Sequence, residues 1–497
     1  MKKKKLNGIL KNRLVKIKLK LKYIVLIFAL LFFNDIRAYD IKIEIENCPE
    51  YYVFFGKHRG PDFIIIDSLP VKNNFVNFKS PEKLEHGIYF IAIPPQTRFD
   101  FIIDEVQDFN IKTNTRNILG DMKITGDQQY SIFVDMQKDI AEINKIRSQL
   151  EIQTEFYKNF QADTLSFIKR KIDSLNHFQQ KIYKQYRNQT KPENFLNKVL
   201  AILEGIELTD SISALAYTNP QKHFDYYKKH WLDRVDFSEP GLLNTPAFVF
   251  HKLLEDYCFY FLETKVNNIE DAFQDVDILV NKTSNSLEFN QYVLSYLISR
   301  YENPKDLRLE NLLVYIYRTY FLAKPPTWLE EHVFSVMKYR IEAIQYNLIG
   351  SVAKDLNLPD IDGNLHSVYE MPNKFKLLLF WEPDCDICNE TAIILQSYYY
   401  KLREFDVEVY AVLIDSENEE WSDFIEENDL EWINVYDPKK ETNFEKYYGT
   451  YKTPRIYLLD DENIIIAKDI KAESVYEYIN KLTTKSQKTS SGFFHTF

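Results

Sequence analysis

The chain has 497 residues, which is more than one hydrophobic core usually serves, so we expect about three domains. Hydrophobic residues make up 45% of the sequence, with 34 Tyr and 36 Phe, a composition that can fill aromatic cores and excludes global disorder. Residues 1–38 hold 11 of the 62 basic and one of the 73 acidic residues, which leaves a net charge of −21 on the rest. We therefore expect no nucleic-acid partner.

The N-terminus has the layout of a secretory signal peptide. Its first 22 residues carry ten basic side chains and no acidic one, and the apolar run Tyr23–Phe33 follows. This run has 11 residues, whereas a helix needs roughly 20 to span a bilayer, so we expect cleavage near Ala38 rather than a permanent anchor. No cysteine stands just after the run to be acylated. These features predict an exported protein of the periplasm or cell envelope.

Residues 39–125 have the pattern of a β-rich, sandwich-like domain, and residues 126–346 have the pattern of an all-α domain. In the first region, turn residues separate short apolar or alternating runs. In the second, long stretches have helical periodicity, interrupted at proline-containing breaks. The expected strands are Ile41–Ile45, Tyr51–Phe55, Phe63–Ile66, Phe75–Phe78, Ile88–Ile93 and Phe99–Ile103.

Residues 347–483 alternate between strands and helices, which indicates a third domain of the α/β class. The expected strands are Lys376–Trp381, Val407–Asp415, Glu431–Tyr436, Arg455–Leu459 and Ile464–Lys468, and the expected helices are Asp386–Phe405, Glu419–Glu427, Asn443–Tyr448 and Glu473–Leu482. Residues 484–497 show neither helical nor strand periodicity, and we expect a flexible tail there. The predicted fold class is therefore a multidomain chain with β-sandwich-like, all-α and α/β parts.

The pair Cys385 and Cys388 stands where an apolar strand passes into an amphipathic helix. At that position, free backbone N–H groups and the helix dipole can stabilise the Cys385 thiolate, which is the attacking species in disulfide exchange. Cys388, one helical turn on, would then resolve the mixed disulfide. Zinc binding and an inert disulfide are the alternatives, but no second Cys or His pair stands at ligand spacing. We expect no metal and no organic cofactor.

A second signal is Thr453-Pro454, where the proline directly precedes an apolar β-run. We expect the Thr453–Pro454 bond to be cis, which would turn the backbone of Thr453 toward Cys385 so that it can pair with an extended substrate segment. The alternative is an ordinary trans proline at the start of a strand.

The order of strand, Trp381, Cys-x-x-Cys helix, Thr453-Pro454 and β-hairpin resembles the TlpA-like branch of the thioredoxin superfamily. The segment Ile349–Leu356 is similar to the lead-in of that branch. The resemblance implies a C-terminal thioredoxin fold, Trp381 packed beside the cysteines, Pro454 shaping a substrate platform, and a membrane thiol-transfer protein as electron donor. The upstream regions resemble two domains of Bacteroidetes envelope proteins, an N-terminal β domain and an uncharacterised helical domain. The first resemblance rests on Asp67-Ser68 and Phe75, and the second on Val235-Asp236-Phe237 and Leu242-Leu243-Asn244-Thr245-Pro246.

The sequence departs from that branch around the cysteines. The position three residues after the second cysteine, where many members have Glu, is Thr391, with Glu390 beside it. The strand position of the buried acid in ordinary thioredoxins is Leu379, so we expect water or Glu390 to handle protons. Glu382, Asp384, Asp386 and Glu390 disfavour a thiolate at Cys385, which favours the disulfide and predicts a reductant-type potential. The Pro-x-x-x-Thr-x-x-Cys pattern of peroxiredoxins is absent around both cysteines.

We therefore predict a protein-disulfide oxidoreductase that acts as reductant or isomerase on disulfide-containing envelope proteins. The alternative is an envelope binding or scaffold protein with little redox turnover. Aromatic residues of the helical region, such as Tyr226 and Trp231, could form a client groove, although core packing is the commoner role. We expect Cys258 to be a buried inert thiol and Cys48 to face solvent in a turn, with a pairing between them left open.

Overall fold

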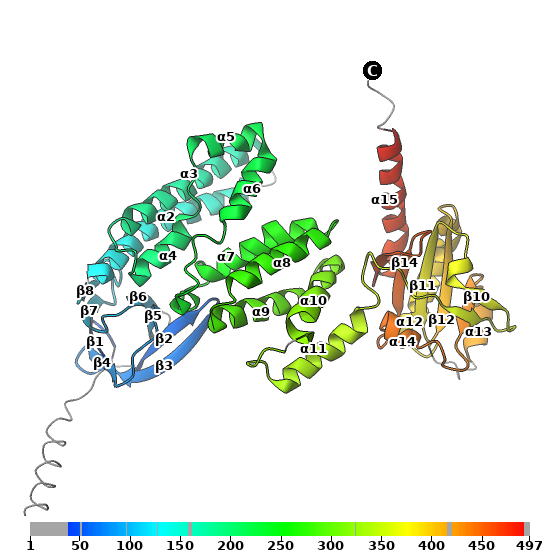
Figure 1. Ribbon diagram of the computed structural model, residues 1–497, viewed down its shortest axis with the longest axis horizontal. Coiled ribbons are helices and arrows are strands. Elements are labelled where there is room, and N and C mark those ends of the chain that lie inside the picture. Colours follow the sequence, from blue (N-terminus) through cyan, green and yellow to red (C-terminus); the bar gives the residue numbers. More distant parts are fainter. Residues whose placement is uncertain are drawn as a thin grey trace, which may run out of the picture. The chain divides into compact units, whose positions relative to one another are not determined.

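The computed structural model describes residues 38–49, 52–95, 97–126, 128–157, 162–323, 325–414 and 420–491. The predicted signal peptide, apart from Ala38, thus lies outside the described residues. The chain forms two compact units, Met1–Tyr257 with Lys282–Phe289 and Cys258–Asn281 with Asn290–Phe497 (Figure 1). Within the described residues, no helix combines the length and the apolar character that crossing a membrane requires.

The first unit begins with a β-sandwich of two four-stranded sheets. Its strands are β1 (Tyr39–Glu46), β2 (Tyr52–Arg59), β3 (Asp62–Pro70), β4 (Phe75–Ser80), β5 (Gly87–Ile93), β6 (Thr97–Ile103), β7 (Asp108–Asn114) and β8 (Lys123–Thr125). One sheet has the order β4-β1-β7-β8 and the other β3-β2-β5-β6. The predicted sandwich is confirmed, and β7 and β8 are strands additional to those expected from the sequence.

Aromatic rings join the two sheets of the sandwich. The ring of Phe55 on β2 lies 5.1 Å from that of Phe78 on β4, and both side chains are fully buried. Strand β3 is different, because it forms the edge of its sheet and Phe63–Ile66 are all exposed. An apolar run in the sequence therefore marks the strand correctly here, but not its burial.

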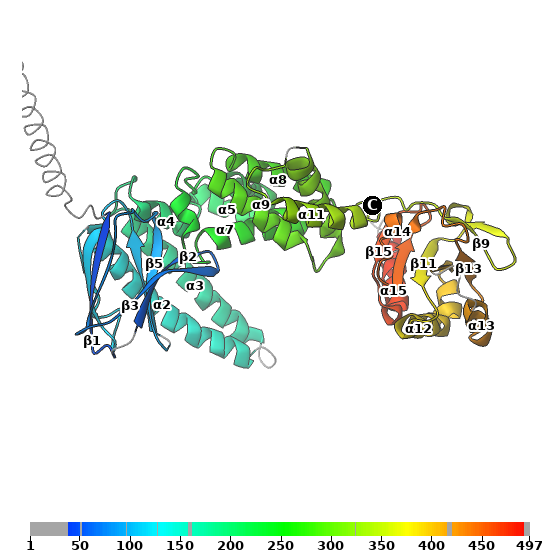
Figure 2. The same cartoon turned by 90° about the horizontal axis from the view of Figure 1, so that it is seen from below.

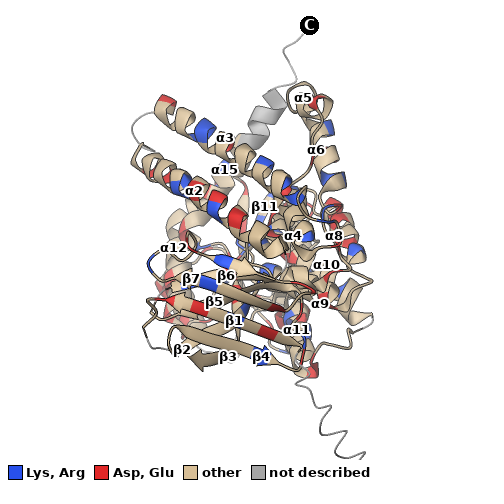
Figure 3. Cartoon of the chain, turned by 90° about the vertical axis from the view of Figure 1, so that its left-hand side faces the viewer, with Lys and Arg blue, Asp and Glu red and all other residues tan. Residues whose placement is uncertain are grey.

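Helices follow the sandwich in the first unit. They are α2 (Gln128–Tyr157), α3 (Ala162–Arg187), α4 (Phe195–Glu204), α5 (Asp210–Thr218), α6 (Pro220–His230), the 3₁₀ turn η1 (Pro240–Leu243) and α7 (Phe250–Tyr257). Helices α2 and α3 pair as an antiparallel hairpin, in which the Tyr186 hydroxyl donates to Asp139 at 2.7 Å and Arg147 donates to Asn176 at 3.1 Å. Figure 3 shows acidic and basic residues interspersed along both helices, as on a solvated surface.

The segment after η1 attaches the helices to the sandwich. The N–H of Ile88 donates to the carbonyl of Asn244 at 2.8 Å, and the N–H of Gly60 donates to the carbonyl of Thr245 at 3.0 Å. Asn244 and Thr245 are buried, and a Cβ atom at Gly87 would lie 2.9 Å from the Asn244 carbonyl oxygen. The Leu242–Pro246 segment therefore has a structural role within the first unit.

Further helical segments lead to the C-terminal domain. They are the π-helical η2 (Cys258–Leu262), η3 (Glu263–Lys265), α8 (Glu270–Lys282), α9 (Leu287–Tyr301), η4 (Leu307–Leu309), α10 (Glu310–Ile316), the π-helical η5 (Tyr317–Leu322) and α11 (Glu331–Ile344). The region between the sandwich and the α/β domain is thus helical, as predicted.

The C-terminal domain is α/β. It consists of β9 (Asn357–Pro359), β10 (Leu365–Ser367), η6 (Val368–Glu370), β11 (Phe375–Trp381), α12 (Asp386–Arg403), β12 (Val407–Leu413), α13 (Glu420–Glu427), β13 (Ile433–Tyr436), α14 (Phe444–Tyr448), β14 (Arg455–Leu459), β15 (Ile465–Lys468) and α15 (Ala472–Ser491). Its main sheet has the order β13-β12-β11-β14-β15. The central strand β11 is parallel to β12 and antiparallel to β14, which is the arrangement of a thioredoxin fold.

Strand β11 is buried on both faces and separates two cores. Leu377, Leu379 and Trp381 belong to the core that contains residues of α12 and α15. Leu378 and Phe380 belong to the opposite core, with α14 and the lead-in to the domain. Figure 2 shows α12 and α14 on opposite sides of the sheet. This two-sided burial explains why β11 is a continuous apolar run in the sequence.

The last helix of the chain is longer than the sequence predicts. The sequence predicts a flexible tail from residue 484, but α15 continues to Ser491, and only residues 492–497 lie outside the described residues. The Thr483 and Thr484 hydroxyls both donate to the carbonyl of Asn480, within the helix. Lys and Gln have good helix propensity, and extending a formed helix needs no new nucleation. The missing apolar period therefore did not mark the end of the helix.

Candidate active site

The fold places Cys385 at the N-terminus of α12, directly after the sheet. Its backbone is extended (φ −107°, ψ 110°), and its Sγ accepts the Cys388 backbone N–H at 3.3 Å, so Cys385 is the N-cap of the helix. The carbonyl of Pro383 accepts a hydrogen bond from the Asn389 side chain at 2.6 Å, which holds the preceding loop against the first turn. The Cys385 sulfur is partly exposed. It is therefore reachable and lies where a helix stabilises a negative charge.

Cys388 lies one turn further along α12 and is fully buried. Burial raises the pKa of its thiol to about 12, and the hydrogen bond and charge of Cys385 act in the same direction. Hydrogen bonds from the backbone of Glu382 and from the Thr453 side chain act in the opposite direction. Cys388 is therefore a protonated thiol at neutral pH when the pair is reduced. The two cysteines have the asymmetry that an attacking and a resolving sulfur need.

The Thr453–Pro454 peptide is cis, as expected. Strands β11 and β14 pair antiparallel with Phe380 opposite Arg455, and continuing this register by two residues brings Glu382 opposite Thr453. The Thr453 hydroxyl donates a hydrogen bond to the Glu382 carboxylate. Because Thr453 also contacts the Cys388 thiol, a hydroxyl connects the buried sulfur with a carboxylate.

Glu382 is a residue whose position the sequence pattern did not reveal, since it counts there only as one of four surrounding acids. A signal existed, because a thioredoxin fold pairs the end of this strand with the residue before the proline. Glu390, in contrast, is exposed on α12. It lines a depression of about 380 Å³ beside Pro454, whose apolar wall is formed by Ile387, Ile394, Ile456 and Ile470. The structure thus gathers Cys385, Cys388, Thr453 and Glu382, and places Glu390 at the adjacent surface.

Trp381 lies under the site rather than in it. It is fully buried in the same core as Cys388, and its ring centroid is 5.3 Å from that of Phe424 on α13. This agrees with the packing that we expected for it beside the cysteine pair.

The other two cysteines lie elsewhere in the fold. No disulfide joins any two of the four cysteines, all of which are in the described part of the chain. Cys258 is fully buried, as predicted. The expectation that Cys48 faces solvent was wrong, because it is only 9% exposed and burial raises the pKa of its thiol. Asn47 has a left-handed backbone (φ 57°) and the Cys48 N–H returns to the carbonyl of Ile45, which turns the thiol inward.

No group of three or more His, Cys, Asp or Glu side chains within the described residues is arranged to hold a metal ion. A thioredoxin-fold sheet, a cysteine N-cap, a buried second cysteine and a cis-proline opposite them define a domain of the thiol–disulfide exchange class.

Comparisons of the sequence with a family model and with curated proteins agree with this class. Residues 349–468 match the AhpC/TSA family model. The thiol-disulfide oxidoreductase ResA of Bacillus thuringiensis is 27% identical over 139 residues, which cover 27% of this chain and 79% of ResA. Among solved structures, a thioredoxin-like protein from Bacteroides caccae is 22% identical, with a TM-score of 0.41, covering 56% of this chain and 97% of its own. A domain of a possible thiol-disulfide isomerase from Cytophaga hutchinsonii is 34% identical, with a TM-score of 0.27, covering 29% and 97%.

The C-terminal domain of this chain belongs to the thioredoxin superfamily, in its TlpA-like branch of thiol–disulfide oxidoreductases. The peroxiredoxin signature is missing even though the family model carries the AhpC/TSA description, since Glu382 and Leu378 stand where that signature needs Thr and Pro before Cys385. The match therefore covers the shared domain and not the peroxidatic motif.

Proposed function

We propose that this protein is an exported protein-disulfide oxidoreductase that reduces or isomerises disulfides of periplasmic or envelope proteins. The observation that carries the proposal is the pairing of a partly exposed, helix-capping Cys385 sulfur with a fully buried Cys388 thiol one turn away. The basic, apolar N-terminal segment in the sequence supports export.

The reaction begins with attack of the Cys385 thiolate on one sulfur of a client disulfide. That S–S bond breaks, a mixed disulfide forms, and the second client sulfur leaves as a thiolate that takes up a proton. Cys388 then loses its proton and attacks the Cys385 sulfur. The mixed disulfide breaks and a Cys385–Cys388 disulfide forms. The client leaves as a dithiol that has gained the two electrons lost by the cysteine pair. A membrane thiol-transfer protein with a reduced dithiol would restore the pair.

The resolving step requires that a buried thiol with a pKa of about 12 loses its proton. Two features support this step. The contribution of Cys385 to the raised pKa is lost once its sulfur is bound in a mixed disulfide, so the pKa of Cys388 falls when it has to attack. The Thr453 hydroxyl, which contacts this thiol and donates to the Glu382 carboxylate, offers a path for the proton. We assign the acceptor role to Glu382, with Glu390 as the alternative that the sequence suggested.

Pro454 and the depression beside it supply a place for the client chain. The backbone of Thr453 can pair with an extended client segment. The isoleucine side chains of the depression, of which Ile387 is 66% exposed, can accept an apolar client residue next to the disulfide. The lining also includes the acidic residues Glu390, Asp469 and Glu473 and the basic residue Lys471, so acidic groups prevail there and a basic residue on the client would fit.

The test is a trapping experiment in the native envelope. In the Cys388→Ser variant the mixed disulfide cannot be resolved, so we expect adducts of envelope proteins on Cys385 that are released by a reductant. The Cys385→Ser variant is the matched control and should trap none. Wild-type protein should also reduce insulin disulfides in the presence of a dithiol. Absence of both adducts and reduction would reject the enzyme and leave a binding or scaffold protein.

A further inference from the structure

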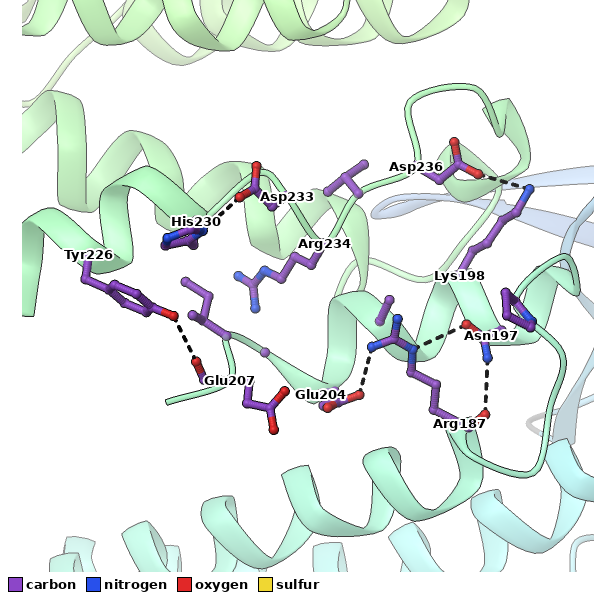
Figure 4. A pocket seen from close by; sticks show the side chains of 15 residues that line it. Arg187, Asn197, Lys198, Glu204, Glu207, Tyr226, His230, Asp233, Arg234 and Asp236 are labelled. Carbon is purple, nitrogen blue, oxygen red and sulfur yellow. Dashed lines mark hydrogen bonds and ion pairs between the residues drawn. The ribbon is translucent and has the colours of Figure 1, made fainter. Parts of the chain in front are cut away.

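The first unit contains a polar pocket that the proposed redox function does not use. It has a volume of about 480 Å³ and lies between the end of α3, helices α4 and α6, and the loop that follows α6. Figure 4 shows side chains from these segments facing one another across it. Its volume is in the range of sites for small organic molecules.

Most charged groups of this pocket are neutralised by neighbours. The carboxylates that line it each have a cationic partner: Glu204 with Arg187 at 3.1 Å, Asp236 with Lys198 at 3.1 Å, Asp233 with Lys282 at 3.6 Å, and Glu207 with Lys184 at 2.6 Å. These pairs leave little net charge on the walls.

Arg234 is the exception. Its Nε donates to the carbonyl of Trp231 at 3.2 Å and its Nη1 donates to the carbonyl of Ile202 at 3.3 Å. Within the described residues it forms no ion pair with a carboxylate, so three of the five guanidinium N–H donors lack a protein acceptor. Burial lowers the pKa of Arg234 to about 10, and the charge of the Asp256 carboxylate acts in the opposite direction, so the group stays charged at neutral pH. Guanidinium N–H groups that are removed from water cost stability unless an acceptor meets them, and a ligand can supply that acceptor.

The surroundings hold this guanidinium toward the open space. It stacks over the Trp231 ring, with its central carbon 4.6 Å from the ring centroid. Figure 4 shows its nitrogen atoms pointing into the pocket, between His230 and Arg187. Gly205 adjoins it without a side chain, and a Cβ atom there would lie 3.6 Å from Nη1. Both acceptors of its hydrogen bonds are main-chain carbonyls, so the backbone holds the guanidinium group in place.

We propose that this pocket binds a small organic molecule or a peptide terminus through a single carboxylate held by Arg234. A planar guanidinium presents parallel N–H groups that match a carboxylate. The free donors of one guanidinium match a monoanion, whereas a phosphate dianion would need a second cation, and Arg187 and Lys198 in the same walls are already paired with carboxylates. The rings of Tyr226 and His230, whose centroids are 4.5 Å apart, give the rest of the ligand an aromatic surface.

The first experiment compares two ligands on the unmodified full chain. N-acetylphenylalanine carries one carboxylate and one ring, and N-acetylphenylalanine amide has the same shape without the charge. By calorimetric titration we expect the acid to bind with a Kd below about 1 mM and the amide to bind at least tenfold more weakly. 3-Phenylpropionate distinguishes the two sources of a carboxylate. Equal binding of it indicates a free organic acid and weaker binding indicates a peptide C-terminus, and both support the site.

The second experiment tests the residue. Arg234→Gln should weaken binding of the acid at least tenfold, whereas Arg116→Gln, at an exposed arginine of the sandwich domain, should not change it. The comparison of acid with amide needs no variant, so it stands even if Arg234→Gln does not fold. Equal binding of acid and amide, no binding of either, tighter binding of inorganic phosphate, or an Arg234→Gln variant that binds as the wild type does would each overturn the proposal.

Discussion

The change Glu382→Gln tests whether a carboxylate takes the proton of the resolving cysteine. The pKa of Cys388 is about 12 in the reduced pair, about five units above neutral pH. At 1.36 kcal/mol per unit, ionising this thiol at pH 7 without help costs about 7 kcal/mol. Part of that cost disappears in the mixed disulfide, where Cys385 carries no charge, and the remainder is what an acceptor has to offset.

A glutamine keeps the shape of Glu382 and can still accept the hydrogen bond from Thr453, but it cannot hold the proton. General-base assistance typically contributes about 10²–10⁴ in rate, so we expect the resolving step to slow by at least about 10²-fold at pH 7. The first attack by Cys385 should change far less. The defect should shrink as pH rises, because solvent base then ionises the thiol.

Stopped-flow reaction with an aromatic disulfide reagent separates the two steps. Attack by Cys385 releases one coloured thiolate, and resolution by Cys388 releases the second. Glu390→Gln is the matched control, because Glu390 is an exposed acid on the same helix as the cysteines. If Glu382→Gln left the second phase at the wild-type rate, the relay through Thr453 would be refuted, and a slow second phase in Glu390→Gln would assign the role to that residue.

Three other changes have defined outcomes. Asn244→Ala should destabilise the first unit by about 1–3 kcal/mol in urea unfolding, because the buried amide donates to the Glu85 carboxylate and the His86 carbonyl; an unchanged midpoint would contradict this. A hydrogen bond with Glu239 raises the pKa of His86. The protonated His86 therefore adds to the free energy of unfolding in full below its unfolded pKa of about 6.5, and this stabilisation is lost as pH rises through the folded pKa. Unfolding at pH 6 and pH 8 should show that loss in wild type but not in His86→Gln. Ile387→Glu should reduce client adducts several-fold in the trapping assay while leaving the reaction with small-molecule disulfides intact. Equal trapping by this variant and the wild type would show that clients do not bind in the depression.

The architecture of the C-terminal domain could be predicted because its pattern is local. A strand buried on both faces is a continuous apolar run, and Phe375–Trp381 differs by one residue from the expected strand. The start of α12 was also a local signal, because the Cys-x-x-Cys pair follows that strand directly and opens an amphipathic run. The cis Thr453–Pro454 bond followed from the resemblance rather than from the pattern itself.

Features that depend on distant pairing could not be predicted in this way. Glu382 meets Thr453 only because two strands pair across 71 positions of sequence, and no local pattern records that register. The run Phe63–Ile66 predicted a strand, but its exposure results from the edge position of β3, which sequence alone does not fix. Strand β7 had a signal, since Phe109 and Ile111 alternate with polar residues, yet the run was too short and polar to stand out.

The position of Cys385 as the N-cap of α12 has a consequence for the stability of the two redox forms. Its sulfur is the acceptor for the first-turn N–H of Cys388, and a thiolate accepts such a bond better than a disulfide sulfur does. In the proposed reaction, each cycle would therefore strengthen and weaken the same helix end. The turn that carries Cys388 would lose this hydrogen bond's strength when Cys385 is bound to a client, which is the step in which Cys388 has to attack it.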